Sequence, residues 1–574
     1  MGESELALPS PQRGGRGLAP VVRVDADKCR NCHACIAACP VKYCNVASGE
    51  VVEINSDRCI ACGCCIDACT HSARLPVDDW DAFWSDLQAG VKIVAVVAPA
   101  VVAAFPHRYQ HLNGWLKSAG VRAAFDVSLG AELTVQSYLR HIQEDQPRTV
   151  VAQPCPAIVN YIELYRPELL PHLAPAGSPM QHSMAMIRRY YPQYADHKIA
   201  VISPCIAKKR EFEATGLGDY NVTMRSLHNY IQEQRIDLAR FPQVEFEGPP
   251  AERAVLFSSP GGLRDTLERW NADAARATRK IEGPRTVYAY LDELPQALKE
   301  GCAPLLIDCL NCEKGCNGGT GTPARKLGHD RIEFLVAERA RQARAHYASK
   351  GPRDADAQDA IAPTLQELDE PGLYRREYVN RAADARVRKP GPAELQAIYA
   401  QMYKQRQEDF YNCGACGYST CEGMATAIFN GLNRPENCHY FLASLNQQTE
   451  RQQTETLKGV MVDFEQTIAK VNHVAKTTDR LQAVANAILR ISNQTHILAL
   501  NASIEASRAG AAGAAFGVVS KAVRDLARSV RQEAEAIDPC SVAMREAFDT
   551  VLVEVDRLAQ RLATVIQRNT GKPH

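Results

Sequence analysis

The placement of cysteine constrains this chain more than any other feature. Its 574 residues include 21 cysteines, which stand in clusters rather than evenly along the sequence. Disulfide frameworks of that density belong to small secreted domains. The N-terminal residues 1–20, however, are rich in Gly, Pro and Arg and lack the apolar stretch of a signal peptide. We therefore expect a reduced, cytoplasmic protein whose cysteines bind metal, with residues 1–20 as a disordered tail.

Length and charge narrow the possible functions. A chain this long exceeds one hydrophobic core, which predicts roughly three to five domains. Lysine plus arginine equals aspartate plus glutamate, 66 against 66, so no net field favours nucleic acid or an anionic membrane. The apolar run Val91–Phe105 is shorter than the ~18 residues of a membrane helix and predicts a buried strand followed by a loop. We expect no nucleic-acid partner and no membrane span.

The first cysteine cluster contains one spacing written twice. The run C-x2-C-x2-C-x3-C is that of bacterial ferredoxins, in which each fourth cysteine ligates the other 4Fe-4S cluster. We therefore expect a ferredoxin-like domain with two 4Fe-4S clusters over residues 21–80; two unrelated zinc knuckles are the alternative. Cys44 and Cys64 fall outside the run and are interpreted as packing thiols. The expected ligands are Cys29, Cys32, Cys35, Cys39, Cys59, Cys62, Cys65 and Cys69.

Three further cysteine motifs are far apart in sequence but have similar surroundings. Cys155 stands in Ala-Gln-Pro-Cys-Pro, Cys205 in Ser-Pro-Cys-Ile-Ala-Lys, and the last motif is Cys-Glu-Lys-Gly-Cys-Asn-Gly-Gly, residues 312–319. The β-branched runs 149–152 and 199–202 lead into the first two cysteines, which places their thiols at strand ends, where α/β sheets bind ligands. Residues 90–347 are therefore predicted to form an α/β domain with a cluster site; a fortuitous zinc site is the alternative.

These motifs resemble the catalytic domain of iron-only (FeFe) hydrogenases. The resemblance implies a two-lobed α/β domain holding an H-cluster, in which a 4Fe-4S cubane is bridged through the Cys316 sulfur to a two-iron subcluster with CO and cyanide. It implies that Lys208 donates a hydrogen bond to a cyanide. Glu211 matches a glutamate of the family, with a solvated surface charge as the alternative. The implied cubane ligands are Cys155, Cys205, Cys312 and Cys316.

Several positions depart from the hydrogenases that turn over hydrogen. Where those relatives carry a proton-transferring cysteine, this chain has Pro154, which has no exchangeable proton. Their glutamate-bearing helix aligns with residues 133–142, which contain no carboxylate. General acid–base catalysis needs a titratable group at each hop, so we expect slow turnover. Their relay serine, two methionines and a glutamine are replaced by Ala174, Ser203, Leu310 and Met180. The pattern resembles a sensory subgroup of the family, with Cys316, Lys208, Ser203 and Glu211 as candidate catalytic residues.

A fourth cysteine set follows a polar segment. Residues 348–395 are rich in Asp, Arg, Ala and Pro and are predicted to be a solvated linker with at most a short helix. In residues 396–445 the four cysteines resemble the small α-helical 4Fe-4S domain of corrinoid iron-sulfur proteins, which implies a third electron-transfer cluster. Zinc is the alternative, because four thiolates hold either metal. The cysteines are Cys413, Cys416, Cys421 and Cys438.

Residues 446–574 have heptad periodicity and almost no Gly or Pro. One seam ascends through Phe464, Val471, Thr478 and Ala485, and a second recurs every seven residues from Phe516 to Val565, which predicts an antiparallel helical hairpin turning at residues 510–513. Residues 494–510 resemble the signalling tip of methyl-accepting chemotaxis proteins, with a generic coiled coil as the alternative. Ala511, Ala514 and Ala515 depart from that family near its kinase-docking surface. Pro539 is expected to kink the descending helix, at about 3 kcal/mol if unrelieved.

Taken together, the resemblances predict a sensor of hydrogen or redox state. Its expected partners are hydrogen, a redox partner such as ferredoxin, an unidentified kinase or phosphatase, and a second copy of the chain through the coil. Two alternatives remain open: an active ferredoxin-dependent hydrogenase with an unusual relay through Tyr138, His141 or water, and a scaffold protein that holds only the cubane.

Overall fold

The computed structural model describes residues 18–348, 357–370 and 372–570. The chain divides into two compact units, Met1–Tyr440 and Phe441–His574, and each is described by itself. The predicted disordered tail up to residue 17 and linker residues 349–356 lie outside the described residues.

The first part of the larger unit is a ferredoxin-like domain, as its duplicated cysteine run predicts. Strand β1 (Val22–Val24) pairs antiparallel with β4 (Arg74–Pro76), and β2 (Asn45–Val46) pairs with β3 (Glu53–Ile54). Helices α1 (Ala34–Ala38) and α2 (Cys64–Asp67) begin at the same point of each run, directly after a residue in the left-handed conformation, His33 and Gly63. The sequence duplication is thus also a structural one.

Two parallel sheets form the lobes of the following α/β domain. The first has the order β6 (Ala124–Asp126), β5 (Ile93–Val97), β8 (Lys198–Ser203), β9 (Tyr220–Thr223). The second has the order β10 (Thr278–Glu282), β11 (Leu306–Leu310), β7 (Val150–Val151). All five residues of β5 are buried, as in a central strand covered by helices on both faces. The two-lobed α/β prediction and the strands before Cys155 and Cys205 are therefore confirmed.

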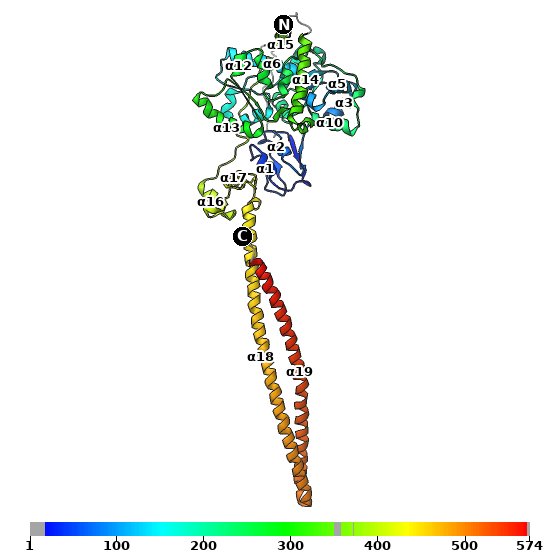
Figure 1. Cartoon of the computed structure of the whole chain (residues 1–574), viewed down its shortest axis with the longest axis vertical. Helices are drawn as coiled ribbons and strands as arrows, with labels where there is room; N and C mark the ends of the chain where they lie inside the picture. Colours follow the sequence, from blue (N-terminus) through cyan, green and yellow to red (C-terminus); the bar gives the residue numbers. More distant parts are fainter. Residues whose placement is uncertain (1–17, 349–356, 371, 571–574) are drawn as a thin grey trace. The chain divides into compact units, whose positions relative to one another are not determined.

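Helices cover both sheets (Figure 1). Those of the first lobe are α3 (Trp80–Gln88), α4 (Val101–Ala104), α5 (Tyr109–Ser118), α6 (Val127–Glu144), α8 (Pro179–Tyr190), α9 (Lys208–Thr215) and α10 (Met224–Glu233). Those of the second are α7 (Pro156–Tyr165), α11 (Gly262–Glu268), α12 (Ala272–Arg276) and α13 (Pro284–Glu300), with the short strand β12 (Glu313–Cys316) after β11. Helix α14 (His329–Ala348) follows.

Part of the segment predicted to be a solvated linker packs on the α/β domain instead. Helix α15 (Ala357–Leu368) forms, but Ile361, Leu365 and Tyr374 are buried in the same hydrophobic core as β5. Beyond it Arg376 is buried as well. The high Arg and Asp content that suggested a solvated segment instead supplies ion pairs to the α/β domain. We call residues 374–388 the strap.

Two short helices, α16 (Pro392–Gln401) and α17 (Cys421–Phe429), carry the fourth cysteine set. The smaller unit is the predicted antiparallel hairpin: α18 (His439–Arg508) turns through residues 510–513 into α19 (Ala514–Thr570) (Figure 1). Helix α19 runs on through Pro539. Among the described residues, no helix combines the length and apolar character that a bilayer crossing requires.

Small side chains form the contact between the two arms of the hairpin. The buried residues recur every seven positions, at Thr478, Ala485, Ser492, Ala499 and Ala506 on α18 and at Ser520, Ala527, Ala534 and Ser541 on α19. The large apolar seam of α19 is not used within the hairpin, because its side chains stay exposed, from 36% at Val523 to 58% at Phe516. Thr478 and Ala485 belong to the seam between the arms, as the heptads predict, whereas Leu481 lies between them in sequence and is exposed.

The burial of the segment after α14 generates a test. Ile361→Ala removes a fully buried side chain from the core around β5 and is expected to cost about 2–4 kcal/mol. Val379→Ala, in the strap but exposed, is the matched control and should change stability by less than about 0.5 kcal/mol. Denaturant unfolding followed by tryptophan fluorescence measures both; equal effects would mean that α15 does not pack on the domain in solution.

Candidate metal centre

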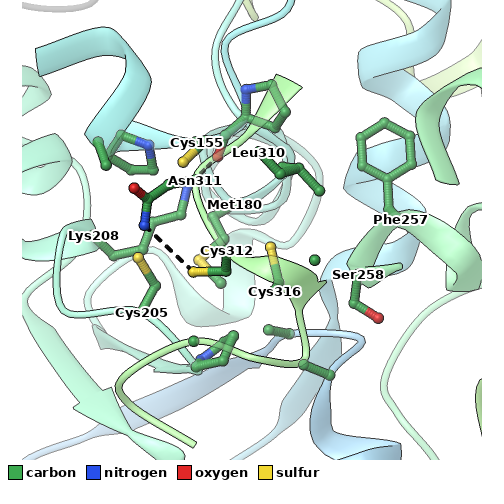
Figure 2. Close-up of a pocket in the computed structure, with 18 of the residues that line it drawn as sticks. Cys155, Met180, Cys205, Lys208, Phe257, Ser258, Leu310, Asn311, Cys312 and Cys316 are labelled. Atoms are coloured by element: carbon green, nitrogen blue, oxygen red, sulfur yellow. Dashed lines mark hydrogen bonds between the residues drawn. The ribbon is translucent and has the colours of Figure 1, made fainter. Parts of the chain in front are cut away.

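Four thiols from three separate motifs meet at the ends of parallel strands. Cys205 follows β8 and Cys312 follows β11 at two residues' distance, Cys155 lies just beyond β7, and Cys316 ends β12. All four line one cavity of about 80 Å³ between the two lobes (Figure 2). The structure therefore brings together the cysteines that the sequence assigned to the cubane.

The rest of the cavity wall is mostly apolar. Ala98, Pro99, Met180, Leu310 and Phe257 line it. A glycine permits the closest approach of two cysteine motifs: a Cβ on Gly319 would lie 2.3 Å from the Pro204 carbonyl oxygen. A side chain at position 319 would therefore collide with the backbone beside Cys205.

A buried ion network supports the one ammonium group of the wall. Lys208 Nζ lies 2.6 Å from Glu211 Oε2, 2.9 Å from Ser178 Oγ and 3.3 Å from the Pro154 carbonyl oxygen. The other Glu211 oxygen accepts a hydrogen bond from Arg376 at 3.0 Å. All the side chains of Lys208, Glu211 and Arg376 are buried, so the alternative of a solvated Glu211 is wrong. Two cations and one carboxylate leave an excess positive charge, which fits an anionic group in the cavity.

Ser203 does not line the cavity. Its hydroxyl accepts a hydrogen bond from the Cys205 backbone N–H at 3.2 Å and lies 3.0 Å from Asn221 Oδ1. Ser203 therefore shapes the loop that carries Cys205, and among the four candidate catalytic residues only Lys208 and Cys316 face the cavity.

Burial makes these thiols poor acids in the absence of a bound cation. It raises the pKa of Cys205 to about 11 and that of Cys316 to about 12, with the neighbouring Cys155 thiol adding to both shifts. The Lys208 ammonium opposes the rise in the pKa of each. Thiols must lose their protons to bind metal. Bound cationic iron would provide the positive charge that stabilises the thiolates at these buried positions.

The other two regions of cysteines are also gathered. Cys39 lines a cavity together with Cys59, Cys62 and Cys65 from the second run, which is the crossed arrangement expected of a duplicated ferredoxin. In the first run the Arg74 guanidinium donates to Cys35 Sγ at 3.2 Å, and the next residue back, Ala73, donates its N–H to Cys69 Sγ at 3.3 Å. Cys413, Cys416, Cys421 and Cys438 all line a further small cavity.

The spacing of these thiols does not favour zinc. Within residues 18–348, 357–370 and 372–570, no three His, Cys, Asp or Glu side chains stand close enough to hold a single metal ion. A zinc site needs its sulfur donors at about 2.3 Å from one centre, whereas a cubane spreads its four ligands over four iron atoms. Thiols placed around a cavity, rather than around a point, fit the larger group.

Family models match four parts of the chain. They are a 4Fe-4S dicluster domain over residues 21–70, the C-terminal domain of the iron-only hydrogenase large subunit over 91–320, an Fe-S cluster domain over 411–440 and the methyl-accepting chemotaxis protein signalling domain over 445–571. The chain joins an iron-only hydrogenase domain to a chemotaxis signalling domain.

Individual relatives cover different shares of it. The large subunit of a periplasmic hydrogenase from Nitratidesulfovibrio vulgaris is 26% identical over 56% of this chain and 90% of its own length. An iron hydrogenase from Clostridium pasteurianum is 28% identical over 28% of this chain, which spans only 31% of that relative. A chemotaxis protein from Pseudomonas putida is 39% identical over 17% of the chain and 18% of its own length. A solved FeFe hydrogenase from Chlamydomonas reinhardtii, 17% identical, covers 53% of this chain and all of its own with a TM-score of 0.40.

Polar groups near the hydrogenase pocket are held by local partners. The Tyr138 hydroxyl donates to Gln153 Oε1, and the Gln153 amide donates to the carbonyl oxygens of Ala176 and Gly177 at 2.7 Å. His141 pairs instead with Asp145, 2.7 Å away on an exposed turn of α6. Burial lowers the pKa of His182 to about 4, and its ring lies 2.9 Å from Ser137 Oγ. Glu132 directly precedes residues 133–142, the segment that aligns with the glutamate-bearing helix of hydrogenases. It is buried in an ion pair with Arg269 and accepts hydrogen bonds from three backbone N–H groups.

Sequence reasoning missed three residues of the site. Arg376 lay in a segment read as linker, and its sequence context carries no signal for a contact with Glu211. Ser178 begins α8 with a capping box, a recognisable Ser-x-x-Gln pattern, yet its hydroxyl also contacts Lys208. Asn311, directly before Cys312, is buried and lines the pocket.

The buried ion network predicts unequal effects of two substitutions. Glu211→Gln leaves Lys208 and Arg376 without their counter-ion, and is expected to cost about 3–5 kcal/mol. Arg376→Met leaves the Lys208–Glu211 pair intact and neutral overall, so it should cost clearly less. Glu233→Gln, at an exposed carboxylate on α10, is the control, with an effect of less than about 0.5 kcal/mol. Equal losses for Glu211→Gln and Glu233→Gln in denaturant unfolding would contradict the network.

Proposed function

We propose that this chain is a sensor that reads hydrogen or redox state in the hydrogenase domain and signals through its coiled coil. Its residues would hold three 4Fe-4S electron-transfer clusters and an H-cluster, whose cubane is ligated by Cys155, Cys205, Cys312 and Cys316. When bound, the H-cluster supplies the metal site at which hydrogen is split or formed. The fusion to a chemotaxis signalling domain fits such a sensory role.

The composition of the pocket wall carries this proposal. Of the described residues that line it, the cysteines and Lys208 alone have titratable side chains. Pro154 occupies the wall where turnover would need a proton carrier, and its carbonyl oxygen accepts a hydrogen bond from Lys208. A pocket that lacks a dedicated proton carrier suits the detection of hydrogen better than its rapid turnover.

Active hydrogen turnover is the second candidate, and one observation favours it. Tyr138 and Gln153 form a buried hydrogen-bonded pair whose second member is directly next to Pro154 in the chain. A proton route through this pair would make the chain an enzyme. However, burial holds the pKa of Tyr138 well above its ordinary value, so its hydroxyl is a weak proton donor.

The strap supports a connection from the pocket toward the fourth cysteine set. It begins with Tyr374. Two residues later, Arg376 donates a hydrogen bond to Glu211. Next, the backbone N–H groups of Val379 and Arg381 donate to Glu163, at 3.2 and 2.8 Å. At its end, Arg388 and Asn430 exchange two hydrogen bonds of 3.1 and 2.9 Å. Asn430 directly follows α17, the helix that begins with Cys421. The strap therefore runs from the ion partner of Lys208 to the helix that carries Cys421.

A second contact joins the ferredoxin domain to the fourth cysteine set. Lys42, three residues after Cys39, donates to the Gly417 carbonyl oxygen at 3.0 Å and to the Ala37 carbonyl oxygen at 3.1 Å. Gly417 follows Cys416, and a Cβ there would lie 2.5 Å from the Ile36 side chain. The two cysteine regions therefore approach as closely as backbone packing allows. We propose that a charge change in one region acts on the other through Lys42, because its partly buried ammonium group lies beside both.

The coil is proposed to pair with a second copy of the chain. The large apolar seam of α19 is exposed in one hairpin, and two hairpins that bury these seams would make a four-helix bundle. We propose a cytoplasmic homodimer whose output is a kinase or phosphatase and whose redox partner is a ferredoxin-like protein.

The proposal predicts a spectrum and a rate. Anaerobically matured protein should give infrared bands of CO and cyanide that shift with hydrogen, and Cys316→Ser should remove them. Turnover should be roughly 10²- to 10⁴-fold below that of hydrogenases with a complete relay. Pro154→Cys should restore little of it, because the neighbouring helix still has no relay carboxylate.

Each alternative has its own outcome in these measurements. A cubane-only scaffold would show no such bands after full maturation. An enzyme with a relay through Tyr138 would turn over rapidly and lose most of its rate in Tyr138→Phe, which should leave a sensor's slow rate unchanged.

The signalling step predicts a hydrogen-dependent change in the hairpin. Nitroxide labels attached to non-natural residues at positions 507 and 529, both exposed, leave the cysteines unmodified. Hydrogen should change the distance distribution or mobility of the labels, because one added charge in a partly desolvated site biases a nearby two-state junction by about 1 to 3 kcal/mol. Cys416→Ser should abolish the response and leave the infrared bands intact.

The contact through Lys42 provides the matched pair of variants for this step. Lys42→Met should weaken the response, whereas Lys28→Met, on an exposed lysine of the same domain, should not. Labels that stay unresponsive while the bands shift would make the coil a passive oligomerisation element.

A further inference from the structure

One amide side chain contacts both the ferredoxin domain and the hydrogenase pocket. Asn311 Nδ2 donates to the carbonyl oxygen of Cys62 at 3.0 Å and lies 3.6 Å from Cys312 Sγ (Figure 2). Cys62 lines both the cavity of the second ferredoxin run and the hydrogenase pocket, and Cys312 lines the hydrogenase pocket. The two hydrogens of a single NH2 group are thus directed at residues from two separate cysteine sets.

The orientation of this amide is fixed by its partners. The Cys62 carbonyl oxygen can only accept a hydrogen bond, so the NH2 end of Asn311 must face it. On the other side, the Tyr288 hydroxyl donates to Asn311 Oδ1 at 2.8 Å. Both side chains are buried. Asn311 therefore has its donors and its acceptor satisfied, and rotation of the amide would break all three contacts at a cost that burial increases.

A donor at a cysteine sulfur acts on redox state. A cubane that takes up one electron gains one negative charge, part of which resides on its thiolate sulfurs, and hydrogen bonds to those sulfurs stabilise the reduced form. An N–H group at Cys312 would raise the reduction potential of the group bound there. The same amide acts on Cys62 through the carbonyl oxygen rather than the sulfur, so its effect on the ferredoxin centre is weaker.

We propose that Asn311 is a positioning residue that sets the reduction potential of the cubane in the hydrogenase pocket and fixes the Cys62 loop against it. This inference rests on the proposed function for the cubane, but not on the two-iron subcluster. It gives the sensor an element, outside its metal ligands, that determines at which ambient potential the pocket becomes reduced.

The test is a redox titration of the full chain loaded with iron and sulfide. Dithionite is the reductant; each oxidised centre takes up one electron and no bond is made or broken. Electron paramagnetic resonance follows each centre, and the signal that Cys312→Ser alters is assigned to the pocket. At the wild-type midpoint, Asn311→Ala should lower the ratio of reduced to oxidised pocket centre roughly three- to tenfold, as expected for one lost hydrogen bond.

Three further variants separate this role from simple packing. Asn311→Asp has the same shape but replaces the donor with an anion beside Cys312 Sγ, so its shift should exceed that of Asn311→Ala. Tyr288→Phe keeps the ring and removes only the hydroxyl that holds the far end of the amide, so it should give a smaller shift of the same sign. Tyr161→Phe is the control, because its ring lies 4.7 Å from that of Tyr288 while its hydroxyl contacts Asp292 instead; it should give no shift.

The outcomes divide clearly. An unchanged pocket midpoint in Asn311→Asp, or an equal shift of every centre in the protein, would overturn the proposal. If the Asn311 variants fail to take up iron, Tyr288→Phe carries the test alone, and a midpoint equal to wild type would overturn it. Absence of CO and cyanide bands in matured wild type would remove the sensor function but leave this test standing, because the titration needs only the cubane.

Discussion

Convergence of thiols at the carboxyl ends of parallel strands is the constraint on which the hydrogenase domain depends. Strands β8 and β11 belong to different sheets, yet Cys205 and Cys312 follow them at the same distance and face one cavity. Two sheets must therefore keep a fixed mutual orientation. The packing that maintains it is tight enough to exclude a Cβ at Gly319. Every other feature of the pocket, including the placement of Lys208 after β8, follows from this geometry.

Burial of charge makes the same pocket selective. Thiols whose pKa is raised to about 11 or 12 by burial do not ionise near neutral pH by themselves. The network of Lys208, Glu211 and Arg376 adds positive charge on one side of the cavity. A site of this kind favours a bound group that brings cationic iron to the sulfurs, because iron stabilises the thiolate forms.

Local sequence patterns were sufficient for the elements and the thiols but not for the segments that tie them together. Spacing placed the cysteine sets, strand runs placed β7 and β8, and heptads placed the hairpin. The strap was missed because its composition is that of a solvated chain, and only the fold reveals that Arg376 meets a buried carboxylate 165 residues earlier. Ser203 was assigned to the pocket from its alignment, yet its hydroxyl binds the Cys205 loop. Periodicity likewise located both apolar seams of the coil but did not show that small residues form the buried contact between its arms.

The arrangement also suggests how one protein can combine a slow metal site with a signalling output. A fast enzyme needs proton carriers in its wall, and each carrier would add a charge that titrates within the pocket. Among the described residues that line the pocket, only Lys208 and the cysteines carry titratable side chains. Under the proposed function, the charge of the pocket would therefore follow the redox state of a bound metal group with little compensation from protons. A distant contact can respond to a change of charge that proton uptake does not cancel. The strap and Lys42 both begin beside charged or ligating groups and both end next to the fourth cysteine set, directly before the coil. In the proposed sensor, a pocket wall without proton carriers would preserve the electrostatic change that a signalling output requires.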